Sequence, residues 1–90
     1  MPKKKPWTVY LLRCKDGSLY TGITTDLRRR LAQHNDGTGA KYTRSRRPVA
    51  IAWKWTRQTE SSARKREAAI KQLTREEKLD LIRKKRTRRA

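Results

Sequence analysis

Arg30 and His34 are the two side chains in this sequence best placed to act on a phosphate group. They lie four positions apart, so they share one face if the surrounding residues form a helix. The Arg30 guanidinium would clamp phosphate oxygens, and the His34 imidazole would donate to phosphate or transfer protons. Two ordinary readings remain open. Arg30 follows two other arginines in a basic segment, and a histidine near a helix end is often a partly buried structural residue.

Glu67 is the acidic residue with a candidate role in metal binding. The other acidic residues are explained by turns, helix caps, first helical turns or an exposed helix surface. Glu67 instead falls in mid-helix on the inward stripe, between Ala63 and Ile70. A single inward carboxylate can hold Mg²⁺ if substrate phosphate and water complete the coordination. The alternative is an ion pair with Lys71, four positions on, which stabilises a helix by about 0.3–0.5 kcal/mol.

Tyr10 and Tyr20 lie in two expected strands, residues 7–14 and 18–24, that form a β-hairpin. A three-residue loop with left-handed Gly17 pairs position 14 with position 18 and puts both tyrosines on one face of the sheet. A two-residue Asp-Gly loop would put them on opposite faces. We predict the three-residue loop. Taken singly, each tyrosine reads as a half-buried strand aromatic.

The rest of the chain supplies further elements and two basic tails. A glycine in mid-strand, Gly22, indicates close approach of a ligand or of another backbone. We expect one domain over residues 7–82, a basic tail at 1–6 and a second at 83–90. The expected elements are a helix over 26–35 capped by Thr25 or Asp26, a helical turn over 40–43, a strand over 48–56 whose apolar residues Val49, Ile51, Trp53 and Trp55 alternate, a helix over 60–73 and a last helix opened by a capping box at 74–77.

The charge balance points to a polyanionic partner. The formal net charge is +18, from 26 basic and 8 acidic residues, which favours nucleic acid. We expect no membrane partner, because no amphipathic helix with a large exposed apolar face is evident and no stretch approaches a membrane span. The single cysteine fits a reducing, cytoplasmic setting. Phosphate contacts would come from both tails and from the basic residues Lys41, Arg44, Arg46 and Arg47.

Together these residues resemble the GIY-YIG nuclease domain, in particular its small stand-alone members. Val9-Tyr10 is followed ten positions later by Tyr20-Thr21-Gly22, and the resemblance covers residues 7–82. The match continues through Thr24, Asp26, Leu27, Arg30, His34 and Glu67. Both triplets differ from the family's letters at positions that carry no catalytic group. A supporting asparagine that some members carry after the glutamate has no counterpart here.

The resemblance implies an α/β (α+β) fold, with a three-stranded antiparallel sheet flanked by helices. It implies an endonuclease dependent on Mg²⁺ or Mn²⁺ that hydrolyses phosphodiester bonds of DNA, including structured or damaged DNA. Glu67 would hold the metal ion and Arg30 would neutralise the phosphoryl charge. Tyr10 or Tyr20 would orient or deprotonate the attacking water, assisted by His34, and the choice between the tyrosines stays open. Gly22 and Thr24 would lie against the nucleic acid.

The rival prediction is a non-catalytic protein that binds DNA or RNA on the same scaffold. Its charge and tails would look the same, but binding alone has no need for an inward carboxylate beside two tyrosines and an arginine. A third hypothesis is a ribosome-associated structural protein. It explains the basic tails but not the combination of two tyrosines, an arginine and an inward carboxylate. Because the sequence holds no separate recognition domain, a protein partner that supplies specificity is a further expectation.

Overall fold

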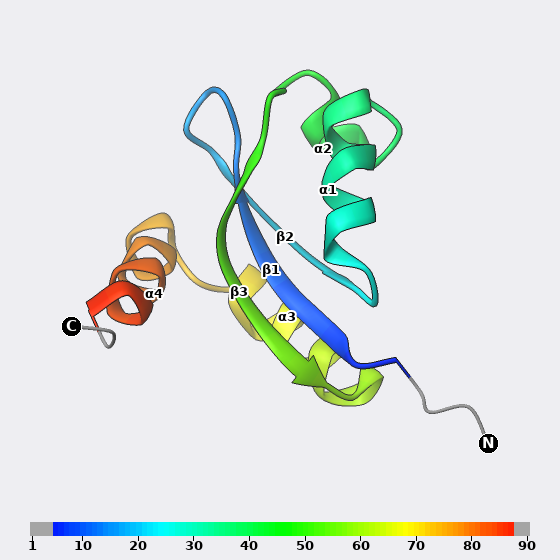
Figure 1. Cartoon of the computed structure of the whole chain (residues 1–90). Coiled ribbons are helices and arrows are strands. Elements are labelled where there is room, and N and C mark those ends of the chain that lie inside the picture. The colour runs from blue at the N-terminus through cyan, green and yellow to red at the C-terminus, as the bar shows by residue number, and fades with distance from the viewer. Residues whose placement is uncertain (1–4, 88–90) are drawn as a thin grey trace.

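The protein is an antiparallel three-stranded sheet with helices on both faces (Figure 1). This computed structural model describes residues 5–87, with side chains through position 84. The strands are β1 (Trp7–Arg13), β2 (Leu19–Thr24) and β3 (Ala50–Gln58), in the order β2-β1-β3. The central strand β1 is paired along both edges and packed on both faces, and the burial of both faces is what its apolar sequence predicts. The fold class expected from the sequence is confirmed.

The hairpin between β1 and β2 closes with the predicted three-residue loop. The Cys14 N–H donates to the Ser18 carbonyl at 2.9 Å, and Gly17 has a φ of +85°, a left-handed conformation that glycine adopts without steric cost. In this register Tyr10 lies opposite Gly22, and Leu12 lies opposite Tyr20. Both tyrosines therefore occupy the same face of the sheet.

The helices divide between the two faces of the sheet. Helix α1 (Leu27–Asp36) and the short α2 (Lys41–Arg44) cover the face that carries the tyrosines, whereas α3 (Glu60–Lys71) and α4 (Arg75–Thr87) cover the other (Figure 1). Each long helix begins at a side-chain cap, as the sequence indicates. The capping residues are Asp26 for α1, Thr59 for α3 and Thr74, within the expected capping box, for α4.

Strand β3 departs from the alternation that its sequence suggests. Trp53 pairs with Leu11, but Ile51 pairs with Leu12, so Ala52 is an extra residue in a β-bulge. Because of the bulge, side chains before and after Ala52 that would share one face of a regular strand lie on opposite faces of the sheet. Val49 packs with Leu12 on the tyrosine face, and Trp53 packs with Leu11 on the opposite face. The prediction that these apolar residues simply alternate along one strand was therefore wrong, because the strand is not regular.

The described chain reaches into both segments expected as tails. Helix α4 continues to Thr87, past the expected domain end at position 82. Residues 1–4 and 88–90 lie outside the described residues. Among the helices that the structure describes, none has the length and apolar character that crossing a bilayer requires.

Candidate active site

Helix α1 presents Arg30 and His34 toward the tyrosine face of the sheet. Leu27 and Leu31 anchor the helix by packing against the cluster that contains Tyr10 and Leu12. Arg30 and His34 lie on the neighbouring stripe, as their four-residue spacing predicts. His34 is fully buried at 0% exposure, whereas Arg30 is only partly buried. The helix therefore holds the imidazole inside the protein and the guanidinium at the rim.

Gly22 makes room for the buried Tyr10 side chain. The Tyr10 ring lies across β2, so that a Cβ added at Gly22 would collide with the hydroxyl and lie 2.6 Å from Cζ. Gly22 itself is buried. The prediction that a ligand or another backbone approaches Gly22 was therefore wrong, because the space beside this glycine is filled by the Tyr10 side chain of the neighbouring strand.

Gly22→Ala is expected to displace Tyr10 and to lower stability by about 1–3 kcal/mol, the usual cost of overpacking a filled core. The free energy of unfolding, measured by urea denaturation, checks this. A matched substitution, Thr56→Ala in the exposed part of β3, should cost less. Stability unchanged by Gly22→Ala would mean that the Tyr10 ring is not confined as described.

A chain of three hydrogen bonds runs inward from Tyr10. The Tyr10 hydroxyl lies 3.1 Å from Nε2 of His34, and Nδ1 of His34 lies 2.8 Å from the Thr43 hydroxyl. The Thr43 hydroxyl in turn donates to the Ala40 carbonyl at 3.1 Å. Tyr10, His34 and Thr43 are each at most 1% exposed, so this chain is shielded from solvent.

The hydrogen-bond network assigns the protonation of His34. A hydroxyl has one proton, and the Thr43 proton is used on the Ala40 carbonyl, so Thr43 must accept from Nδ1–H. Burial, together with the Arg30 charge, lowers the pKa of His34 and keeps the ring neutral at pH 7. Nε2 is then a free acceptor, and the Tyr10 hydroxyl donates to it. The Tyr10 hydroxyl proton is therefore hydrogen-bonded to an unprotonated nitrogen, Nε2 of His34.

Thr43→Val is expected to release His34 from the Nδ1–H tautomer, because valine keeps the shape and removes the hydrogen-bond partner. Thr43→Ser, which keeps a hydroxyl, should preserve it. The chain contains one histidine, so ¹⁵N NMR of the imidazole reports His34 without ambiguity. A wild-type protein with the proton on Nε2 would contradict the assigned direction of the chain.

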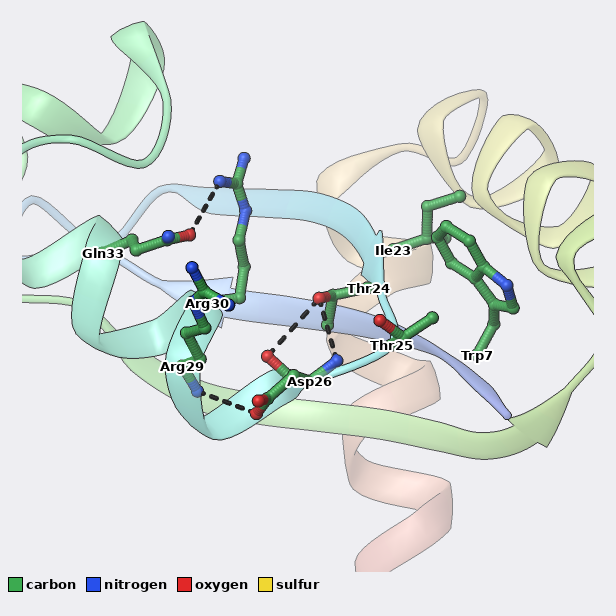
Figure 2. Close-up of a pocket in the computed structure, with 8 residues that line it drawn as sticks. All are labelled: Trp7, Ile23, Thr24, Thr25, Asp26, Arg29, Arg30 and Gln33. Carbon is green, nitrogen blue, oxygen red and sulfur yellow. Dashed lines mark hydrogen bonds between the residues drawn. The ribbon is translucent and has the colours of Figure 1, made fainter. Parts of the chain in front are cut away.

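Arg30 is held by two acceptors from its own helix and the loop that follows. Its Nη1 donates to Oε1 of Gln33 and its Nη2 to the Gly39 carbonyl, each at 3.2 Å (Figure 2 shows the Gln33 bond). Gly39 also packs directly on the histidine, since an added Cβ would lie 2.6 Å from His34 Nδ1. Gly39 thus positions both functional side chains of α1 at once.

Burial raises the pKa of the Tyr10 hydroxyl, and three neighbouring side chains change it further. Arg30, through a side-chain interaction and its positive charge, opposes the rise. Tyr20 and Glu67 add to it, because negative charge nearby disfavours a phenolate. Three of the other four side chains singled out in the sequence, Tyr20, Arg30 and Glu67, therefore act electrostatically on the Tyr10 hydroxyl. The fourth, His34, is hydrogen-bonded to it.

Glu67 is half-buried on α3 and has a partner there. Its Oε2 lies 3.3 Å from Nζ of Lys71, so the ion pair expected as the alternative reading is present. Within the described part of the chain, no three acidic, histidine or cysteine side chains cluster as a metal cage. A single carboxylate still suits Mg²⁺, which commonly keeps several waters and binds through one or two carboxylates plus substrate phosphate. The donor set therefore fits a metal ion held mainly together with substrate.

Tyr42 is an aromatic residue at the site that the sequence analysis does not single out. Its ring stacks on Tyr20, with centroids 5.6 Å apart, and the Arg46 guanidinium lies 4.0 Å from the Tyr42 centroid. Tyr20 in turn packs edge-on against His34 at 5.3 Å. Position 42 lies in the short segment expected to form a helical turn, and the alternation of the strands gives no signal for it.

The residues expected to contact nucleic acid lie in different surroundings. Lys41 and Arg44 are exposed on α2. Arg46 donates to Asp16 at 3.1 Å and to the Tyr42 carbonyl at 2.8 Å, and Arg47 donates to the Arg44 carbonyl at 2.8 Å. The Thr24 hydroxyl accepts from the Asp26 N–H and so supports the start of α1.

Comparison with known proteins identifies the class to which this fold and site belong. The family model of the GIY-YIG catalytic domain matches residues 6–80. The chain therefore belongs to the GIY-YIG family, a family of nucleases. Its relatives within that family are UPF0213 proteins, which are small and contain the single domain.

Two curated relatives and two solved structures illustrate this similarity. The UPF0213 protein DP2720 of Desulfotalea psychrophila is 52% identical over 77 residues, which are 84% of this chain and 70% of that protein. The UPF0213 protein SSP2268 of Staphylococcus saprophyticus is 50% identical, over 82% of this chain and 90% of its own. The solution structure of protein EF2693 from E. faecalis has a TM-score of 0.64 and 45% identity, covering 97% and 93% of the two chains. The UPF0213 protein BH0048 of Bacillus halodurans has a TM-score of 0.56 and 44% identity, covering 86% and 82%.

Proposed function

We propose that this protein is a metal-dependent endonuclease that hydrolyses phosphodiester bonds of DNA. The observation that carries the proposal is the buried chain from the Tyr10 hydroxyl to neutral His34, with Arg30 beside the same hydroxyl. A hydrogen-bond acceptor alone would serve any buried tyrosine, but a protein that only bound nucleic acid has no need for Arg30, Tyr20 and Glu67 around the same hydroxyl. The nuclease family to which the chain belongs gives the reaction class.

Tyr10 is the tyrosine that we assign to proton transfer. Its raised pKa makes a standing phenolate unfavourable, so its own proton must leave as it takes one from the attacking water. His34 Nε2 accepts that proton through the existing hydrogen bond; because burial and the Arg30 charge both disfavour a positive ring, Arg30 has to move toward the phosphate before this transfer. Tyr20, which is less buried and packs on His34, then orients the water from the solvent side. No hydrogen bond of the Tyr10–His34–Thr43 chain has to be broken first.

Arg30 links the binding of substrate to the exposure of the Tyr10 hydroxyl. In the free protein it interacts with the Tyr10 hydroxyl, which is 1% exposed with the rest of that side chain. A scissile phosphate would draw the guanidinium outward, because a charge-assisted bond to phosphate is stronger than one to a carbonyl or amide. That movement uncovers the hydroxyl and sets the positive charge where negative charge develops.

Glu67 is the side chain to which we assign the metal ion, Mg²⁺ or Mn²⁺. Bound there, a divalent ion supplies Lewis-acid stabilisation of charge on the phosphate. Lys71 holds the carboxylate in place until the substrate arrives. The basic surface of α2 and the charged segments at both ends supply phosphate contacts for DNA. A reducing, cytoplasmic setting suits the free, buried Cys14.

The test is cleavage of plasmid and of branched, single-stranded and RNA substrates by the wild-type protein, with Mg²⁺ or Mn²⁺ and with EDTA. We expect DNA products that require the metal. Tight binding to every substrate with no cleavage of any would overturn the proposal and favour the non-catalytic binding protein. Cleavage of RNA alone would keep the hydrolysis and contradict the choice of DNA.

A further inference from the structure

A cavity at the rim of the site joins Arg30 to an indole. It has a volume of about 340 Å³, a size in the range of small-molecule sites. Arg29, Arg30 and Gln33 of α1 line one end, and Trp7 and Ile23 of the sheet line the other, as Figure 2 shows. The cavity therefore has a cationic, hydrogen-bonding end and a flat apolar end.

This division of chemistry matches a nucleotide. A phosphate would lie at the end with the two guanidinium groups, and a base has a π-face that suits an indole. Asp26, the one acidic residue that lines the cavity, is used locally, since its Oδ1 accepts from the Arg29 N–H at 3.1 Å. Its negative charge also disfavours a phosphate at the middle of the cavity, which leaves the guanidinium end for the anion.

Trp7 is half-buried, unlike the core residue Trp53. Part of its side chain packs against the core cluster that contains Val9 and Leu11, and Trp7 also lines the cavity, where its indole offers a stacking surface. It also lines a second cavity of about 580 Å³, together with Lys5. Glu60, which also lines this second cavity, is ion-paired with Arg64, so Lys5 is the lining cation available to a neighbouring phosphate of the DNA.

We propose that this cavity binds an unpaired nucleotide next to the scissile phosphate, with its base stacked on Trp7. This inference rests on the proposed function in taking Arg30 as the residue that meets the phosphate. A base inside a duplex has both faces covered by its neighbours, so it reaches Trp7 only when it leaves the stack. The preferred substrate class is therefore DNA that contains an unpaired nucleotide.

The test compares three short duplexes by fluorescence anisotropy in EDTA, where no metal-dependent cleavage occurs. One carries an unpaired adenine, one an unpaired abasic nucleotide at the same place, and one is fully paired. Wild-type protein is expected to bind the adenine duplex about tenfold more tightly than the abasic duplex, because stacking on an aromatic side chain is lost with the base. Equal affinity for these two duplexes would overturn the proposal without any mutation.

Two variants locate the stacking surface. Trp7→Leu keeps an apolar side chain and should bind the adenine duplex only as well as the abasic one. Trp55→Leu changes a half-exposed indole outside the cavity and should keep the full difference. If Trp55→Leu rather than Trp7→Leu removed the difference, the base would stack elsewhere. Because the readout is affinity without metal, a protein that binds as expected but never cleaves would refute the proposed function alone.

Discussion

Arg30→Ala is expected to lower the single-turnover rate of DNA cleavage by about 10²- to 10³-fold, the usual effect of removing one preorganised group that stabilises transition-state charge. In the free protein Gln33 and the Gly39 carbonyl hold the guanidinium at the rim of the site, and substrate binding moves it onto the phosphate before charge builds there. DNA affinity should change far less, because the chain has a net charge of +18 and Arg30 supplies one contact among many. Cleavage rate and affinity are measured on the same labelled substrate.

Arg28→Ala is the matched control. It removes the same charge from the same helix at an exposed position, and residues two apart on a helix do not share a face. Its cleavage rate should stay close to that of the wild type. Equal losses in Arg28→Ala and Arg30→Ala would mean that α1 contributes only general positive charge, and the clamp assigned to Arg30 would be wrong.

Glu67→Gln is expected to remove metal-dependent cleavage, by about 10²-fold or more, because the amide is nearly isosteric and lacks the charge that binds a hard cation. The fold should persist, since the lost ion pair with Lys71 contributes only about 0.3–0.5 kcal/mol. Single-turnover rates across a series of Mg²⁺ concentrations measure the effect.

Lys71→Ala separates the two readings of Glu67. It breaks the same ion pair and leaves the carboxylate in place, so it should cost a little stability and retain most of the cleavage rate. If Glu67→Gln and Lys71→Ala had the same small effect, the glutamate would be structural, and another group would have to hold the metal ion.

The parts of the site that follow from local rules are predictable from the sequence. Gly17 adopts the left-handed conformation that a three-residue loop needs, and this one turn fixes the register that brings Tyr10 and Tyr20 to one face. The four-residue spacing of Arg30 and His34 likewise places them on adjoining turns of one helix. In each case a short-range constraint decides a longer-range arrangement.

The parts that depend on tertiary packing are not predictable in the same way. Thr43 and Gly39 reach His34 only because the loop after α1 folds back onto the helix, and a threonine or a glycine in a loop carries no signal of this. The bulge at Ala52 is another such case, since the sequence of β3 alternates regularly and only pairing with β1 exposes the extra residue. The sequence therefore predicts the reacting groups better than it predicts the groups that position them.

The most direct test of this account is the single-turnover cleavage rate of Tyr10→Phe beside that of Tyr20→Phe. Phenylalanine keeps the buried ring and removes only the hydroxyl that donates to His34. We predict a loss of about 10²- to 10⁴-fold for Tyr10→Phe, the range of general acid–base catalysis, and a smaller loss for Tyr20→Phe. A Tyr10→Phe variant that cleaves DNA at nearly the wild-type rate would contradict the proton path from Tyr10 to His34 on which the proposed mechanism is built.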